Sequence, residues 1–226
     1  MAEKPAPDFS MLLASSVHDI KNSLGMLLET LGEVIADADL TEPGERRRFA
    51  ILQGESTRIN NTLIALLGLY RLGQGQIKAR SEQVFVRDFL EEQIAGQQLL
   101  LDMRGLIATL HCDPEMDAWF DARLIEGVVS NILVNAAKYA RKTITINASK
   151  PAGTLLIEIC DDGPGYPAPL LQGAVSQSID FSSGSTSLGL YFAESIAQLH
   201  GKAAQRGRIE LANNSDGGGR FRLYLP

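Results

Sequence analysis

The amino-acid sequence predicts an α+β fold with two domains, an antiparallel helical hairpin followed by a domain of mixed helices and strands. Two observations favour the hairpin: apolar residues recur at spacings of three and four over residues 9–35 and 49–70, and a Thr-Glu-Pro-Gly breaker at 41–44 separates the two series. A third observation favours the mixed domain, because β-type segments alternate with helical ones beyond residue 76.

The second apolar series predicts a bundle seam as well as a helix. Its members form a heptad with one small polar interruption: Phe49, Leu52, Ser56, Ile59, Leu63, Leu66 and Tyr70. Two helices joined by a short turn cannot cover both of their apolar stripes, so we expect a homodimer that forms a four-helix bundle. Because Gly73 and Gly75 end the hairpin, the predicted domains are residues 1–76 and 77–226.

The second domain is predicted to contain helices and strands in mixed order. Two strands, at 143–148 and 155–160, form a hairpin around Pro151-Ala152-Gly153. The other expected elements are strands at 84–86, 106–111, 209–212 and 221–225 and helices at 87–103, 122–139 and 188–200.

Composition and charge exclude several classes of function. The chain carries 21 Lys and Arg against 27 Asp and Glu, so a basic groove for nucleic acid is not expected. No apolar stretch approaches the roughly 18 residues that a membrane-spanning helix requires, and the N-terminus has no secretory pattern. Cys112 and Cys160 have no metal-ligand spacing. We expect both to be buried small hydrophobes in a cytoplasmic protein without membrane insertion.

One candidate reactive residue lies on the first predicted helix. His18 falls outside the apolar series, so its imidazole should face solvent, where a neutral ring nitrogen is a competent nucleophile. Asp19 beside it can take the ring proton or orient the ring, and Asn22, one turn on, can orient a water or an incoming group. The alternative is an ordinary exposed histidine on a helix surface.

A second motif gathers polar residues on the predicted helix at 122–139. Asn131, Asn135, Lys138 and Tyr139 lie within two helical turns, largely on one side. An amide oxygen is a suitable ligand for Mg²⁺, and a lysine offers a point charge to phosphates, so a nucleotide could be clamped here. The alternative is an amphipathic helix whose polar face is merely solvated.

An acidic turn with glycines follows the strand at 155–160. The carboxylate of Asp161 only accepts hydrogen bonds, so it can bind the exocyclic amine of adenine, and Gly163 and Gly165 let the backbone close over the ring. The alternative is a plain turn. Farther on, Leu188 and Gly189 begin a helix after a loop of serines and glycines, an arrangement that favours phosphate but is common in proteins.

Taken in order, these four motifs resemble the signature boxes of two-component histidine kinases. The resemblance implies a dimerisation and histidine-phosphotransfer hairpin followed by the α/β-sandwich ATPase domain of the gyrase, Hsp90, histidine kinase and MutL superfamily. It implies that His18 is the phosphoacceptor, that Asp19 is its base and that Asn22 belongs to a motif associated with phosphatase activity. The phosphoryl group would pass to an aspartate on the receiver domain of a response regulator.

The same resemblance implies that the cofactors are ATP and Mg²⁺. Asn135 would ligate Mg²⁺, Lys138 would contact the phosphates, Tyr139 would cover the adenine, and Asp161 would bond its amino group. The remaining residues of the implied site are Asn131 in the asparagine box, Gly163 and Gly165 in the first glycine box, and Leu188 and Gly189 in the second.

Departures from the family pattern leave two alternatives open. Ser187 stands where a glycine is usual, Ser23 replaces a proline, and no lysine or arginine occurs between Tyr166 and His200. One alternative is therefore a histidine phosphotransferase or scaffold whose second domain binds ATP weakly or not at all. The other is a hydrolytic ATPase or serine kinase of the same superfamily, although hydrolytic members resemble one another in carrying a glutamate base where this chain has Asn131.

Overall fold

The computed structural model describes residues 20, 22–23, 25–27, 30, 33–34, 43–171, 186–202, 205–215 and 217–226. The described positions between 20 and 34 are all helical, as predicted for the first helix of the hairpin. His18 and Asp19 lie outside the described residues.

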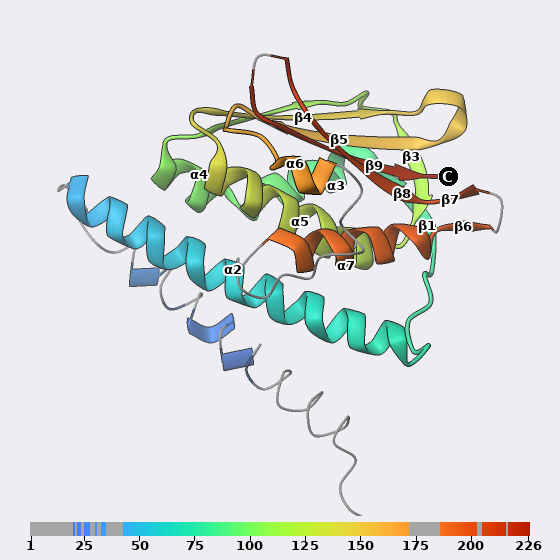
Figure 1. The fold of residues 1–226 in the computed structure, drawn as a ribbon, viewed down its shortest axis with the longest axis horizontal. Helices are drawn as coiled ribbons and strands as arrows, with labels where there is room; N and C mark the ends of the chain where they lie inside the picture. Colours follow the sequence, from blue (N-terminus) through green and yellow to red (C-terminus); the bar gives the residue numbers. More distant parts are fainter. Residues whose placement is uncertain are drawn as a thin grey trace, which may run out of the picture.

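The second helix of the hairpin is α2, Pro43–Gly73. It covers the predicted series at 49–70 and ends at the predicted glycine. In Figure 1 it runs beneath helices α5 and α7, on the side away from the sheet. Its exposed apolar side chains include Leu52, Ile59 and Leu66, whereas Ala65 on another face is buried.

A five-stranded mixed sheet organises the second domain. Its order is β2-β4-β5-β9-β8, in which β2 pairs with β4 in parallel and the other neighbours are antiparallel. As predicted, β4 and β5 form a hairpin around Pro151–Gly153. The strands are β2 Ile107–His111, β4 Thr143–Ser149, β5 Leu155–Asp161, β8 Arg208–Asn213 and β9 Gly219–Leu225.

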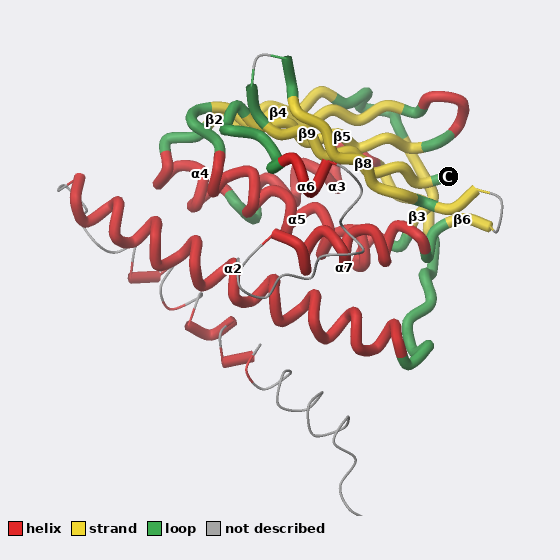
Figure 2. Tube along the Cα trace, viewed as in Figure 1, coloured by secondary structure: helices red, strands yellow, loops and turns green. Residues whose placement is uncertain are grey.

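Helices cover one face of this sheet and complete an α/β sandwich, which confirms the predicted fold class (Figure 2). Two small antiparallel pairs flank the sandwich, β1 with β3 and β6 with β7. The helices are α3 Val86–Ala95, α4 Gln98–Arg104, α5 Ala122–Tyr139, α6 Ala168–Leu171 and α7 Thr186–Gln198, and the small strands are β1 Glu82–Phe85, β3 Asp117–Phe120, β6 Gly201–Lys202 and β7 Gln205–Arg206. None of the described helices is both long enough and apolar enough to cross a bilayer.

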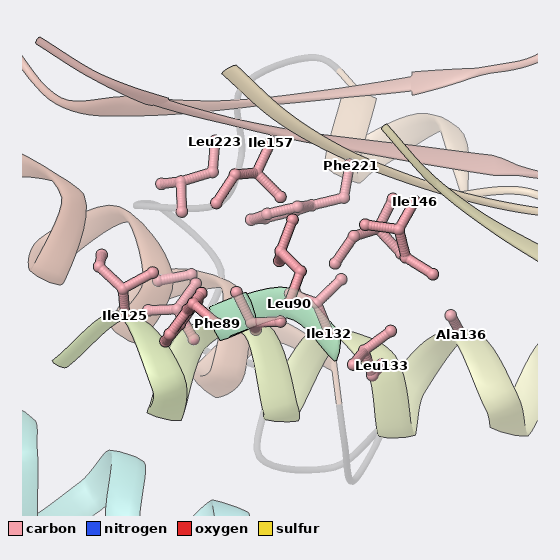
Figure 3. Packing of buried hydrophobic residues seen from close by; sticks show 14 of the residues in the cluster. Phe89, Leu90, Ile125, Ile132, Leu133, Ala136, Ile146, Ile157, Phe221 and Leu223 are labelled. Atoms are coloured by element: carbon pink, nitrogen blue, oxygen red, sulfur yellow. The ribbon is translucent and has the colours of Figure 1, made fainter. Parts of the chain in front are cut away.

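The core lies between the sheet and helices α3 and α5, as Figure 3 shows. Alternate residues of the strands point inward, so that Ile146, Ile157 and Phe221 meet the apolar face of α5. Burial of each such side chain contributes about 1.5–3 kcal/mol relative to exposure. Because the apolar face of α5 is committed to the sheet, its polar residues face away from the core.

Two expectations need correction, and one strand was missed. The helix predicted at 87–103 is two helices, α3 and α4, since the chain leaves the first helix at Gly96. Strand β3 was not predicted, because it is short and exposes Trp119. Cys112 and Cys160 are half-buried rather than buried, and burial raises the pKa of both thiols.

Candidate functional site

A cavity of about 320 Å³ opens between the end of β5 and the last turn of α5. A volume of this order suits a small heteroaromatic ligand. The cavity brings together four of the residues that the sequence singled out, although they are up to 30 positions apart in the chain. Its lining is Asn135, Tyr139, Asp161, Pro164, Gly165, Tyr166, Pro167 and Gly219.

Asp161 is held in place by the backbone around it. Its Oδ1 atom accepts hydrogen bonds from the amides of Gly163, at 2.8 Å, and Gly219, at 3.2 Å. A Cβ atom at Gly219 would lie 2.8 Å from Asp161 Oδ2 and 3.1 Å from the Tyr166 ring. Glycine therefore keeps open a cradle beside Oδ2, an atom that can accept a hydrogen bond from a ligand.

Tyr166 lines the same cavity, and Asn213 holds the Tyr166 backbone in place. The Tyr166 amide donates to Asn213 Oδ1 at 2.7 Å, and Asn213 Nδ2 donates to the Tyr166 carbonyl at 3.0 Å. Gly165 has φ +83°, and a Cβ there would lie 2.8 Å from the Asn213 side chain, so the turn requires glycine. Burial, with the Asp161 charge as a second cause, raises the pKa of the Tyr166 phenol, which stays neutral.

Asp162, next to the cavity residue Asp161, stabilises the connection between α5 and β4. Its Oδ1 atom accepts from the amides of Arg141 at 2.7 Å and Lys142 at 3.1 Å, and its Oδ2 accepts from Thr143 at 3.1 Å. Partial burial opposes ionisation, but these hydrogen bonds outweigh it and lower the pKa of Asp162. The resulting stabilisation is present above the ordinary carboxyl pKa and is lost as pH falls through the lowered one.

A second, narrower cavity of about 30 Å³ lies where α2 meets α5. We call it the interhelical cleft, and it shares Asn135 with the larger cavity, so that the two adjoin. Gly189 of α7 lies against Asn131, because a Cβ at Gly189 would lie 3.0 Å from the amide carbon of Asn131. The cleft is lined by Gly54, Glu55, Arg58, Thr62, Leu100, Arg104, Asn131, Val134, Asn135, Lys138 and Gly189.

The other predicted site residues are distributed around the two cavities. Lys138 lines the cleft, and its Nζ lies 5.2 Å from the ring centroid of Tyr139, a cation–π contact. Leu188 is partly buried against the core and does not belong to the lining of either cavity. Asn22 is helical and exposed.

Sequence reasoning missed several residues that shape the site: Arg58, Arg104, Tyr166, Asn213 and Gly219. Tyr166 directly follows the predicted glycine turn, so its position next to Gly165 could have identified it as a site residue. The others reach the site from distant segments, and only the folded chain brings them there.

The chain is similar in sequence to known proteins. Residues 120–226 match the family model described as histidine kinase-, DNA gyrase B-, and HSP90-like ATPase. The chain is 24% identical over 223 residues to sensor protein kinase PilS of Pseudomonas aeruginosa, covering 94% of this chain and 39% of that protein. It is 26% identical to the sensory histidine kinase/phosphatase NtrB of Vibrio alginolyticus, covering 96% of this chain and 62% of that protein.

Solved structures share the fold. Full-length ShkA in complex with AMPPNP superposes with a TM-score of 0.66 at 17% identity, over 96% of this chain and 45% of that one. The Acinetobacter baumannii histidine kinase AdeS superposes with a TM-score of 0.59 at 19% identity, over 92% of this chain and 96% of that one. The chain therefore spans well under two thirds of the length of PilS and of full-length ShkA.

Proposed function

Residues 120–226 belong to the histidine kinase-, DNA gyrase B- and HSP90-like ATPase family, and from this premise we propose that the chain is an ATP-dependent protein-histidine kinase. It phosphorylates its own His18 and passes the phosphoryl group to an aspartate on the receiver domain of a response regulator. The chain is homologous to sensor histidine kinases along most of its length, which supports this two-component role.

The observation that carries the proposal is the junction of the two cavities at Asn135. The larger cavity has the volume and the acceptor, Asp161, for an adenine ring. The cleft continues from it and has Lys138 in its wall, so the phosphates of the same nucleotide extend toward α2. A second domain without nucleotide binding would not need this arrangement, and the AMPPNP complex of ShkA supports it further.

Asn135 is the residue we propose for Mg²⁺. This residue lines both cavities, and an amide oxygen is a hard donor that suits this ion. Within the described part of the chain, no group of three or more His, Cys, Asp and Glu side chains could hold a metal. Mg²⁺ needs no such group, because it takes one or two protein ligands and completes its shell with phosphate and water. Bound there, Mg²⁺ would neutralise phosphate charge.

The chemistry proposed for His18 is a direct displacement. A ring nitrogen of His18 forms a bond to the γ-phosphorus, the bond from that phosphorus to the bridging oxygen breaks, and ADP leaves. Asp19 takes the proton released from the ring. Little further covalent help is needed, because positioning supplies most of the acceleration. Asn22, one turn on, orients the water that would remove phosphate from the receiver domain.

Unpartnered apolar side chains support a homodimer formed through the hairpin. Each helix has a set of exposed apolar residues that recur every seven positions and are between 40% and 55% exposed: Ile20, Leu27 and Val34, and Leu52, Ile59 and Leu66. Met26 and Ile51 are also exposed and lie next to Leu27 and Leu52 in the chain. A spacing of seven is that of a bundle seam. We therefore propose a four-helix bundle of two chains, with the domain boundary near residue 76.

Label transfer from ATP tests the proposed function. The full chain, incubated with Mg²⁺ and γ-labelled ATP, should acquire label that is acid-labile and base-stable, as expected for a phosphohistidine. His18→Ala should abolish the label. His111→Ala, at an exposed histidine on β2, is the matched control and should keep it. Undiminished labelling of His18→Ala would contradict the assignment of the acceptor.

A further inference from the structure

One wall of the interhelical cleft is formed by the hairpin rather than by the second domain. Gly54, Glu55, Arg58 and Thr62 lie on one face of α2 and stand opposite the residues of α5 that line the cleft. Any group that extends from the larger cavity past Asn135 therefore meets side chains of α2.

Positive charge is concentrated in this cleft. Its lining contains Arg58, Arg104 and Lys138, while the interval from Tyr166 to His200 contains no lysine or arginine. Among the residues that line the two cavities, the Lys and Arg side chains available to a triphosphate are therefore all on the helices around the cleft.

Arg104 is largely committed to the protein itself. Its Nη1 atom donates to the carbonyls of Ala137 and Lys138, each at 3.3 Å, and so stabilises the last turn of α5. Its Nε atom is buried and has no hydrogen-bond partner among the described residues. A buried donor without an acceptor costs free energy. A ligand that brought an acceptor to Arg104 Nε would therefore be stabilised on this side of the cleft.

One partner of Arg58 is a carboxylate on the same helix. The Nε and Nη2 atoms of Arg58 each lie 2.7 Å from Oε2 of Glu55, three residues earlier on α2. The two side chains are 32% and 48% exposed, and ion pairs of this exposed, local kind are weak. A phosphate offers the same planar guanidinium a bidentate interaction with more charge.

We propose that Arg58 is a phosphate-binding residue, which releases Glu55 and binds the terminal phosphates when ATP occupies the site. This rests on the proposed function and extends the nucleotide site into the hairpin. The cleft has a volume of about 30 Å³, about that of one water molecule. Side chains that line the cleft must therefore move before phosphates enter, and in this proposal Arg58 moves from Glu55 to the terminal phosphates.

Nucleotide affinity of the full chain tests the proposal, measured calorimetrically with Mg²⁺ and AMPPNP, ADP or AMP. Arg58→Ala should weaken AMPPNP binding about tenfold, as expected for loss of a charged hydrogen bond, and leave AMP binding unchanged. Arg58→Lys should restore part of the loss. Arg71→Ala removes an exposed arginine from the same helix without touching the cleft and should bind all three nucleotides normally.

Glu55→Gln separates a phosphate ligand from a structural ion pair. If Arg58 binds phosphate, removal of the competing carboxylate should tighten AMPPNP binding severalfold. If the pair only stabilises α2, Glu55→Gln should weaken binding as much as Arg58→Ala does, and the proposal is wrong.

The two proposals fail in different ways. Unchanged AMPPNP affinity in Arg58→Ala, with normal binding by the unmutated chain, would overturn this inference alone. Absence of AMPPNP binding by the unmutated chain would overturn the proposed function and this inference with it. Thermal unfolding of each variant shows whether an observed loss comes from a folding defect.

Discussion

Asp161 and Asp162 are adjacent in the chain and have different roles. The side chain of Asp161 lines the larger cavity, whereas that of Asp162 accepts three backbone hydrogen bonds from the α5–β4 connection. A matched substitution at each position can therefore separate binding from stability.

Asp161→Asn should weaken AMPPNP binding about tenfold or more, because the amide offers a donor where the adenine amine needs an acceptor. Asp162→Asn should retain AMPPNP affinity but lower the free energy of unfolding by about 1–2 kcal/mol, since one backbone amide loses its acceptor. Calorimetric titration and urea unfolding measure the two effects. Equal loss of binding in both variants would contradict the division of roles.

His200 is a buried histidine whose protonation state is fixed by its partners. The Asp121 amide donates to Nε2 at 3.1 Å, so Nε2 must be unprotonated, and Nδ1 therefore donates to the Ile196 carbonyl at 2.9 Å. Burial lowers the pKa of the ring. The neutral form links the end of α7 to the N-cap of α5.

Stability should depend on pH through His200. Its folded pKa is below the unfolded value of about 6.5, so its contribution is complete above that pH and is lost as pH falls toward the folded pKa. Urea unfolding between pH 7.5 and 5.0 should show this decline. His200→Gln should be less stable at pH 7.5 and have a flatter profile. His111→Gln, at an exposed site, should keep the slope of the unmutated chain.

At the residue scale, the sequence predicted side chains whose role depends on local context. Asp161 was predicted because a carboxylate at a strand end before glycines is visible in a few residues. Asn213 and Arg58 were not predicted, because the first contacts Tyr166 from 47 positions away and the second reaches the site through the packing of α2 on α5. Contacts between segments so far apart in the chain leave no pattern in the sequence near either residue.

The packing of α2 on the second domain depends on a close approach at Gly68. A Cβ atom at this position would lie 2.5 Å from the ring of Phe192 on α7, whereas a Cβ at Gly54 would have no neighbour closer than 3.5 Å. Phe192 also lies 3.6 Å from the Cβ position of Gly127 on α5. The Phe192 ring is therefore held between α2 and α5, where Gly68 and Gly127 leave room for it.

Gly68→Ala and Gly54→Ala should change stability in opposite directions. Alanine is favoured over glycine within a helix by about 1 kcal/mol, and Gly54→Ala should gain about this amount. Gly68→Ala should lose about 1–3 kcal/mol, because overpacking against Phe192 outweighs the helical preference. Urea unfolding measures both, and equal stabilisation by the two changes would mean that Phe192 does not pack on α2.

At the element scale, the predictions succeeded where periodicity is local. The residues of α5 and of the β4–β5 hairpin carry their own pattern of burial, and the structure confirms both. The break at Gly96 was missed because apolar residues continue on both sides of it. Strand β3 was missed because its pairing partner, β1, lies 32 or more positions earlier and Trp119 points to solvent.

For the whole molecule, the strongest prediction concerns association. Asparagine at Leu52, Ile59 and Leu66 together should convert the proposed dimer to a monomer, since the seam would lose its apolar side chains and gain polar groups. Sedimentation velocity measures the change. Ile107→Asn alters an exposed apolar residue on β2, outside the hairpin, and should remain dimeric. A triple variant that stays dimeric would place the interface elsewhere.

Helix α2 presents one face to the second domain, at Ala65 and Gly68, and another, at Leu52, Ile59 and Leu66, to solvent. An α-helix turns by about 100° per residue. A deletion or insertion of one residue between Ile59 and Ala65 therefore rotates the face that contacts the second domain relative to the exposed face at Leu52 and Ile59. Seven residues make almost two full turns and keep both in phase. Chimeric proteins that join this hairpin to a foreign catalytic domain should therefore change the length of α2 only in steps of seven.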